Sequence, residues 1–154
     1  MDASRMVSIR PVTRDDASVW ARLRFALWPE ATHAEHARDV ERFFAGQSHE
    51  PLAVLLARDA AGTPLGFAEL SIRNVAEGCE TDRVAYLEGW YVEPEARRQG
   101  VGRALVSAAE EWGRAQGCTE FASDTQIENT ASAAAHAALG FEETERLRCF
   151  RKKL

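Results

Sequence analysis

Three arginines and two glycines lie close together in one short turn of the chain, which reads Arg97-Arg98-Gln99-Gly100-Val101-Gly102-Arg103. A strand-like stretch precedes this turn and a helical pattern follows it. Free N–H groups at a helix N-terminus bind phosphate, and glycine lets a ligand approach the backbone closely. The turn therefore predicts a phosphate-binding site, in which Arg97, Arg98 and Arg103 add positive charge; a solvated basic turn is the alternative.

Two acidic residues stand where carboxylates are uncommon. Glu88 lies inside an apolar strand rich in tyrosine and tryptophan. Asp124 follows a short apolar strand, at the carboxyl end where crevices form in α/β sheets. Both positions favour functional carboxylates. A surface carboxylate on an edge strand remains the alternative for Glu88, and a turn cap remains the alternative for Asp124.

Charge and cysteine content narrow the class of protein. The 154 residues include 19 Lys and Arg against 24 Asp and Glu, a net charge of −5, which disfavours nucleic acid as a partner and favours a cationic ligand. Cys79, Cys118 and Cys149 show neither disulfide nor metal-ligand spacing, so we expect no metal and a cytoplasmic location. No apolar run approaches the roughly 20 residues that cross a membrane, and no apolar signal core is present.

The hydrophobic pattern predicts one α/β (α+β) domain over residues 1–154. Four helices are expected, one between Thr13 and Pro29 and the others at 32–45, 101–117 and 129–139. Strands are expected at 7–12, 52–57, 65–72, 84–92 and 121–124, with one more after residue 141. The strand–helix–strand crossover in the second half favours neighbouring parallel strands.

Three features in this order resemble the GNAT acetyltransferase superfamily. They are the glycine-containing turn, Asn129 at the start of a later helix, and Leu139-Gly140-Phe141 at the end of that helix. The resemblance implies the GNAT fold, a mixed central sheet with splayed fourth and fifth strands and about four helices. It also implies acetyl-CoA as co-substrate.

The same resemblance assigns the coenzyme contacts. The turn from Arg97 to Arg103 would hold the pyrophosphate, and the backbone of Trp90, Tyr91 and Val92 would pair with the pantetheine arm. A bulge there would free an N–H group to polarise the thioester carbonyl. Asn129 would contact the coenzyme, and a plain helix cap is compatible with that role.

A closer resemblance links five segments to the compact, dimeric aminoglycoside 6′-N-acetyltransferases. The segments are Leu27-Trp28-Pro29, Leu87-Glu88-Gly89, Phe121 to Asp124, Glu128-Asn129-Thr130 and 138–146. The subgroup transfers acetyl directly to an amine of a polycationic aminoglycoside and so confers antibiotic resistance. By this resemblance the acceptor would contact Trp28, Glu88, Asp124 and Glu145. The loop at 74–78 lacks the tyrosine usual in the subgroup.

The proposed roles follow from amine chemistry. An aliphatic amine is mostly protonated at neutral pH, so a base must remove a proton before it attacks. Glu88 would accept it through a water, while Asp124 would hold other ammonium groups or share the base role. His136 lies four residues before the Gly-Phe pair, where many family members have a tyrosine, and is the candidate acid. A packing role for His136 is the alternative.

Two other functions remain open at this point: an acetyltransferase for another small amine or a protein N-terminus, and a non-catalytic acyl-CoA-binding module. We also expect a homodimer, because the subgroup is dimeric and a terminal strand from Leu147 to Lys153 would leave an unpaired edge. The alternative is that basic residues on this strand protect the edge and keep the chain monomeric.

Overall fold

One mixed sheet organises the computed structural model, which describes residues 6–154. Its strand order follows the chain, β1-β2-β3-β4-β5, and all neighbours are antiparallel except β4 and β5, which are parallel. The strands are β1 Ser8–Pro11, β2 Ala53–Arg58, β3 Pro64–Arg73, β4 Val84–Val92 and β5 Phe121–Ser123. The mixed sheet and the parallel crossover confirm the predicted fold class.

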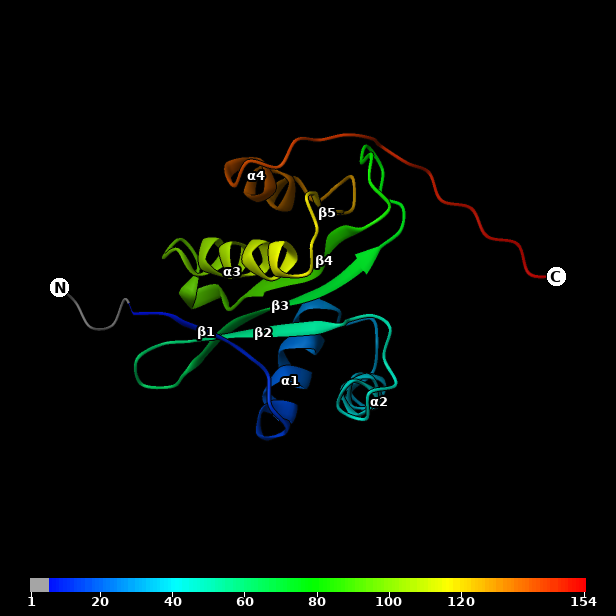
Figure 1. Cartoon of the computed structure of the whole chain (residues 1–154). Coiled ribbons are helices and arrows are strands. Elements are labelled where there is room, and N and C mark those ends of the chain that lie inside the picture. The colour runs from blue at the N-terminus through cyan, green and yellow to red at the C-terminus, as the bar shows by residue number, and fades with distance from the viewer. Residues whose placement is uncertain (1–5) are drawn as a thin grey trace.

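Helices cover both faces of this sheet (Figure 1). On one face lie α1 (Ala17–Leu27) and α2 (His33–Phe44), and on the other lie α3 (Val101–Ala115) and α4 (Thr130–Ala138). Two 3₁₀ turns, η2 (Arg14–Asp16) and η3 (Pro94–Ala96), precede α1 and α3. The predicted four helices are therefore present, each within a few residues of its expected bounds.

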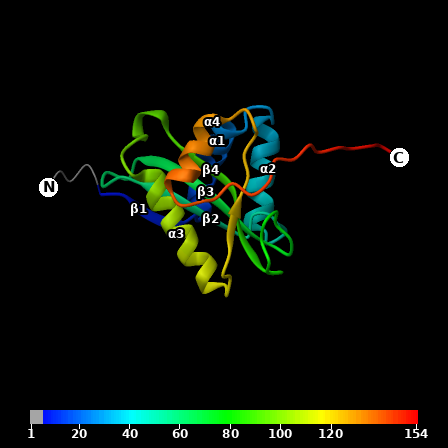
Figure 2. The ribbon, with the colours of Figure 1, turned by 90° about the horizontal axis from the view of Figure 1, so that it is seen from above.

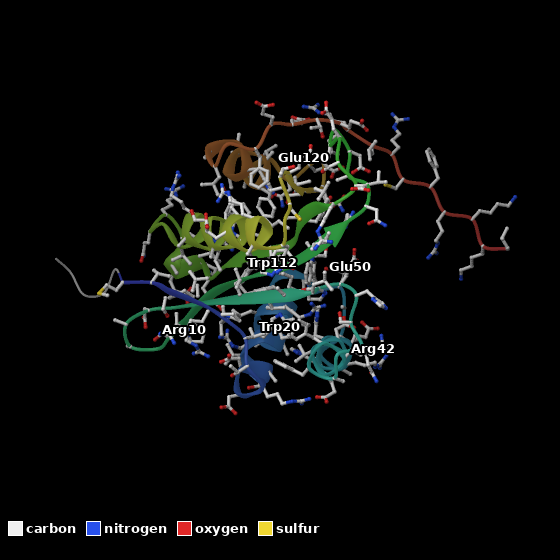
Figure 3. All side chains as sticks on the ribbon, in the orientation of Figure 1. Arg10, Trp20, Arg42, Glu50, Trp112 and Glu120 are labelled. Atoms are coloured by element: carbon white, nitrogen blue, oxygen red, sulfur yellow. The ribbon has the colours of Figure 1, made fainter. Side chains whose placement is uncertain are left out.

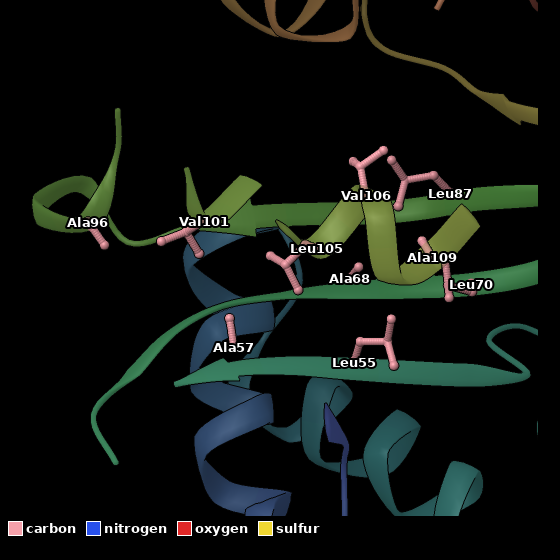
Figure 4. Packing of buried hydrophobic residues seen from close by; sticks show 10 residues of the cluster. All are labelled: Leu55, Ala57, Ala68, Leu70, Leu87, Ala96, Val101, Leu105, Val106 and Ala109. Carbon is pink, nitrogen blue, oxygen red and sulfur yellow. The ribbon is translucent and has the colours of Figure 1, made fainter. Parts of the chain in front are cut away.

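Two hydrophobic clusters fill the space between the layers. Leu70, Leu87 and Leu105 belong to the cluster under α3, shown in Figure 4, and Trp20 and Phe67 belong to the cluster under α1. Because side chains alternate along a strand, β3 sends Ala68 and Leu70 toward α3 and its intervening residues toward α1. The two faces of the sheet can therefore serve different purposes.

The sheet is irregular at the centre of β4. Glu69 pairs with Gly89 and Leu70 pairs with Leu87, so Glu88 is an extra residue that forms a bulge. The expected bulge lay slightly later, at Trp90 to Val92. On the other side, β5 pairs only with Ala85, Tyr86 and Leu87, whereas β4 continues to Val92. The two strands thus diverge beyond Leu87, as the family resemblance implied.

The expected terminal strand from Leu147 to Lys153 is wrong. Residues 141–154 contain neither helix nor strand. Phe141 still packs against Phe121 and Thr144 donates to the carbonyl of Glu77, and Figures 1 and 2 show the rest of the segment running away from the body of the molecule. A strand needs a neighbour to receive its backbone hydrogen bonds, and within residues 6–154 this segment meets no sheet edge. Phe150 is 92% exposed as a result. No helix within 6–154 is long and apolar enough to span a membrane.

Candidate active site

The turn before α3 presents free backbone N–H groups. Gly100 caps α3 with φ of 84°, and Arg98 has φ of 62°, a left-handed conformation that is uncommon outside glycine. The first hydrogen bond into the helix runs from the N–H of Ala104 to the carbonyl of Gly100, at 3.0 Å. The N–H groups of residues 101–103 therefore precede the hydrogen-bonded helix and suit a phosphate.

Side chains of the turn divide into two groups. Arg97 Nε donates to the carbonyl of Val92 at 3.0 Å, and the Gln99 amide donates to the carbonyl of Glu95 at 3.1 Å. These two side chains brace the turn against the end of β4. Arg98 and Arg103 are exposed and make no side-chain hydrogen bond with residues 6–154. They remain available to an anionic ligand.

The turn also packs closely on β4. A Cβ at Gly102 would lie 3.1 Å from Cζ2 of Trp90, so a larger side chain would press on the indole ring. On the far side of this ring lies His136 of α4, with ring centroids 5.3 Å apart. Asn129 caps α4 by accepting the N–H of Ser132 at 3.0 Å, which confirms the helix-cap interpretation of that residue.

His136 is tied to the end of β5. Its Nδ1 lies 2.7 Å from the carbonyl of Ser132, and because a carbonyl only accepts, Nδ1 carries a proton. Nε2 lies 2.8 Å from the hydroxyl of Ser123, whose oxygen is also 3.3 Å from the carbonyl of Leu87. The imidazole is thus both packed between aromatic rings and linked by a hydroxyl to the point where β4 and β5 diverge.

A polar cavity of about 360 Å³ opens on the opposite face, beside α1 and α2. Figure 3 shows two of its residues, Arg42 on α2 and Glu50 in the segment before β2. Four carboxylates and two guanidiniums are among the lining residues, which are Arg24, Trp28, Asp39, Arg42, Gln47, Ser48, His49, Glu50, Pro51, Glu69 and Glu88. The predicted acceptor residues Trp28 and Glu88 therefore meet in one acidic cavity.

The bulge of β4 directs Glu88 into this cavity, where it is held by side chains of β3. Arg73 donates to both carboxylate oxygens, from Nε at 2.9 Å and from Nη2 at 2.7 Å. The hydroxyl of Ser71 donates to the same carboxylate. The hydrogen bond to Glu88 raises the pKa of Arg73 above its ordinary value. Only 16% of the Glu88 side chain is exposed.

Tyr86 connects this ion pair with Asp124. The Arg73 guanidinium lies 3.6 Å from the centroid of the Tyr86 ring, and the Tyr86 hydroxyl donates to Asp124 Oδ2 at 2.6 Å. Burial, reinforced by this hydrogen bond, raises the pKa of Tyr86. The hydroxyl therefore keeps its proton at neutral pH and orients Asp124, which is itself exposed.

Trp28 owes its position to a glycine and a histidine. A Cβ at Gly89 would lie 2.6 Å from Cη2 of Trp28, so the indole ring can lie against β4 only because residue 89 has no side chain. His36 Nε2 lies 2.9 Å from the carbonyl of Trp28. The Arg24 guanidinium lies 5.0 Å from the centroid of the Trp28 ring.

A buried ion pair supports the floor of the cavity. Arg24 Nη1 donates to both oxygens of Glu69, at 2.6 and 2.5 Å, and the indole N–H of Trp20 donates to Glu69 at 3.0 Å. Arg24 also reaches Asp39 at 3.0 Å. Burial raises the pKa of Glu69, and the adjacent guanidinium opposes this effect. The fully paired network fixes α1 and α2 on β3.

Sequence reasoning placed some residues correctly and overlooked others. Glu145 is exposed on the segment after α4 and does not line the cavity. Arg24, Glu69, Ser71, Arg73 and Tyr86 were not identified in advance. A signal for three of them exists, because polar side chains at 69, 71 and 73 alternate along an otherwise apolar β3.

The described residues contain no group of three His, Cys, Asp or Glu side chains placed to hold a metal ion. All three cysteines are free thiols.

Comparison with known proteins places this geometry in context. The model of the acetyltransferase (GNAT) family matches residues 20–141. An aminoglycoside N(6′)-acetyltransferase type 1 from Klebsiella aerogenes is 55% identical over 154 residues, covering 100% of both chains. The structure of the aminoglycoside N-acetyltransferase AAC(6′)-Iy in complex with CoA matches with a TM-score of 0.89 and 39% identity, covering 97% of this chain and 96% of that one. AAC(6′)-Iy with the bisubstrate analogue CoA-S-monomethyl-acetylneamine matches with a TM-score of 0.88 and 40% identity, covering 97% and 99%.

Proposed function

Because the chain belongs to the acetyltransferase (GNAT) family, we propose that it transfers the acetyl group of acetyl-CoA to the 6′-amine of an aminoglycoside. One observation carries this proposal. The sheet opens where β4 and β5 diverge, with a phosphate-binding turn on the α3 side and an acidic cavity on the α1 side. An anionic donor and a cationic acceptor can therefore approach the same strand from opposite faces.

The residues of the α3 side fit a diphosphate. Free N–H groups of residues 101–103 and the exposed Arg98 and Arg103 side chains provide the contacts. Beyond Leu87 the edge of β4 is not paired with β5, so the backbone of Trp90 to Val92 is open to an extended ligand arm. Acetyl-CoA supplies the thioester, and an unpaired amide of the β4 bulge polarises its carbonyl.

The residues of the α1 side fit a polycation. Glu88 faces the reacting amine, and Trp28 forms an apolar wall over which an ammonium can lie. Asp124, oriented by Tyr86, binds a second ammonium group. Glu145 lies outside the cavity, and its segment would have to fold back for it to contribute.

The reaction requires two proton transfers. Glu88 accepts a proton from the acceptor ammonium through a water, after which the neutral amine attacks. A C–N bond forms, the C–S bond breaks, and the nitrogen loses its second proton, which the departing thiolate takes up. The Ser123 hydroxyl, hydrogen-bonded to His136 at the divergence of β4 and β5, relays this proton from the nitrogen to the sulfur. The product amide is uncharged, and the drug loses one of its cationic groups.

The terminal segment supports a homodimer. Residues 141–154 are extended and expose Leu147 and Phe150, which are 56% and 92% exposed. An extended segment with free backbone groups and exposed apolar side chains can pair with a second chain. Sedimentation equilibrium at micromolar concentration tests this: a dimer is expected, and a single species at the 17.1 kDa monomer mass contradicts it.

The catalytic proposal is tested with purified protein, acetyl-CoA and three acceptors, by measuring thiol release. Neamine, an aminoglycoside, is expected to react fastest; spermidine and a peptide N-terminus represent the other acetyltransferase functions. Because acetyl-CoA is a cytoplasmic metabolite, we place the reaction in the cytoplasm, and expression in a susceptible bacterium is expected to raise aminoglycoside resistance. Preference for the peptide, or acetyl-CoA binding without turnover of any amine, would contradict the proposal.

A further inference from the structure

The carboxylate proposed as the base already accepts hydrogen bonds on both of its oxygens. Glu88 accepts two hydrogen bonds from Arg73 and one from Ser71. A guanidinium is a permanent cation, and its planar fork matches a carboxylate in two parallel bonds. A carboxylate held in this way is a poor partner for a second cation and a poor acceptor of its proton. The proposed function therefore requires Arg73 to move.

Arg73 is partly exposed and lies close to a second carboxylate, so its guanidinium can move from one to the other. Its side chain is 33% exposed, whereas that of Arg24, in the buried pair, is 9% exposed. Its Nε lies 3.8 Å from Glu50 Oε1, and Glu50 is 58% exposed at the mouth of the cavity. The ring of Tyr86 lies beneath the guanidinium and provides a surface on which it can slide between the two carboxylates.

We infer that Arg73 occupies, against Glu88, the position of the acceptor's reactive ammonium, and that acceptor binding transfers the guanidinium from Glu88 to Glu50. This inference rests on the proposed function. Arg73 is then a positioning residue and an internal competitor, since every acceptor must displace its guanidinium from Glu88. The apparent affinity of each acceptor is its intrinsic affinity multiplied by the fraction of molecules in which Glu88 is free of Arg73.

The cost of displacing Arg73 is the same for every acceptor, so acceptors differ in the contacts that offset it. A monoamine has only its attraction to Glu88 with which to displace Arg73. A polyamine gains further contacts, at Asp124 and along the acidic cavity, that offset the displacement. The internal cation thus lowers the affinity of all acceptors by one factor, and the weakest binders are the first to lose a useful affinity.

Calorimetric titration of neamine into the CoA-bound protein tests the inference. Arg73→Gln is expected to bind neamine about three- to tenfold more tightly, the range for removal of one partly exposed competing charge. Arg73→Lys keeps the competing charge but loses the two-bond fork, so its gain should lie between wild type and Arg73→Gln. For 6-amino-6-deoxyglucose, a monoamine, Arg73→Gln should raise the affinity by about the same factor, because both acceptors displace the same guanidinium.

Two further variants separate displacement from general electrostatics. Arg42→Gln removes an equal charge from the lining of the cavity without touching the Glu88 ion pair, and so measures the general electrostatic effect. Glu50→Gln removes the receiving carboxylate and should weaken neamine binding about threefold in wild type, but less in the Arg73→Gln background. Equal effects of Glu50→Gln in both backgrounds would overturn the transfer to Glu50.

The inference fails if Arg73→Gln weakens neamine binding or loses more than about tenfold in kcat, because either result indicates that Arg73 only orients Glu88. A gain no larger than that of Arg42→Gln also overturns it, because general electrostatics then accounts for the whole effect. A structure with bound neamine in which Arg73 still donates to both oxygens of Glu88 would also overturn it. Thiol release by the wild type is measured separately. A protein that binds neamine without acetylating it contradicts the proposed function. The binding data for the Arg73 variants still decide whether Arg73 is displaced.

Discussion

The two faces of the sheet present charge by different means. On the α1 side the negative charge lies on side chains. The cavity there is lined by carboxylates paired with arginines, from the buried Glu69–Arg24 pair to the partly exposed Glu88–Arg73 pair. On the α3 side, the backbone provides partial positive charge: free N–H groups follow Gly100, above a core of small apolar residues. A cation requires side-chain carboxylates, because the backbone has no full negative charge, whereas an anion can bind to amides alone.

This difference predicts that variants on one face alter the handling of one substrate. Glu88→Gln should show the largest effect. The amide cannot take a proton, so kcat should fall about 10²–10⁴-fold, the usual contribution of a positioned base. The KM for acetyl-CoA should remain within about twofold of wild type. Steady-state kinetics with neamine measure both, and a kcat within about twofold of wild type would move proton removal to another group.

The buried pair of the α1 side should dominate stability. Arg24→Met leaves Glu69 buried without its main partner and should cost about 3–5 kcal/mol of unfolding free energy. The double variant Arg24→Met, Glu69→Met removes both charges and should recover much of that loss. Equilibrium urea unfolding measures both proteins. A single variant that loses less than about 1 kcal/mol would show that the pair is not needed to hold α1 on the sheet.

The backbone site of the α3 side is tested at Gly102. Gly102→Asp places a negative charge beside the free N–H groups and should raise the KM for acetyl-CoA by more than about tenfold. Gly102→Ala is the matched control, since it makes the same contact with Trp90 without the charge. Neamine binding should change little in either variant. Similar KM values for the two variants would indicate a steric effect and remove the phosphate from this turn.

The smallest effect is expected at Tyr86, where the α1 side reaches β5. Tyr86→Phe removes the hydrogen bond to Asp124 and should raise the KM for neamine about three- to fivefold, because Asp124 is no longer oriented. The KM for acetyl-CoA serves as the internal reference. A rise in both KM values would point to a general disturbance of β4 rather than to loss of acceptor binding.

The sequence predicted local elements better than the partners of charged residues. Capping residues, glycine stops and hydrophobic periodicity located all four helices and five strands, because these signals act within a few residues. The prediction of a sixth strand was wrong, because strand pairing depends on a sheet edge that is distant in the sequence or belongs to another chain, and no local pattern reveals such an edge. The helix cap at Asn129 was foreseen for the same local reason.

Charged residues show where such reasoning stops. Glu88 was chosen because a carboxylate in an apolar strand suggests function, and the same criterion applies to Glu69. The structure separates the two: Glu69 is 2% exposed and paired with the buried Arg24, whereas Glu88 borders the cavity and is paired with the partly exposed Arg73. The β4 bulge and the positions of Arg24 and Arg73 decide which carboxylate is structural and which lies at the site. None of these three features can be predicted from the sequence.

The most direct test of the account is the position of the acetyl group. The protein is incubated with acetyl-CoA and neamine, and the product is analysed by mass spectrometry and two-dimensional NMR while free thiol is counted. Donor and acceptor meeting across β4 predicts one acetyl group per thiol released, on the 6′-nitrogen alone. Thiol release without acetylated neamine, or acetylation of a different nitrogen, would contradict the account.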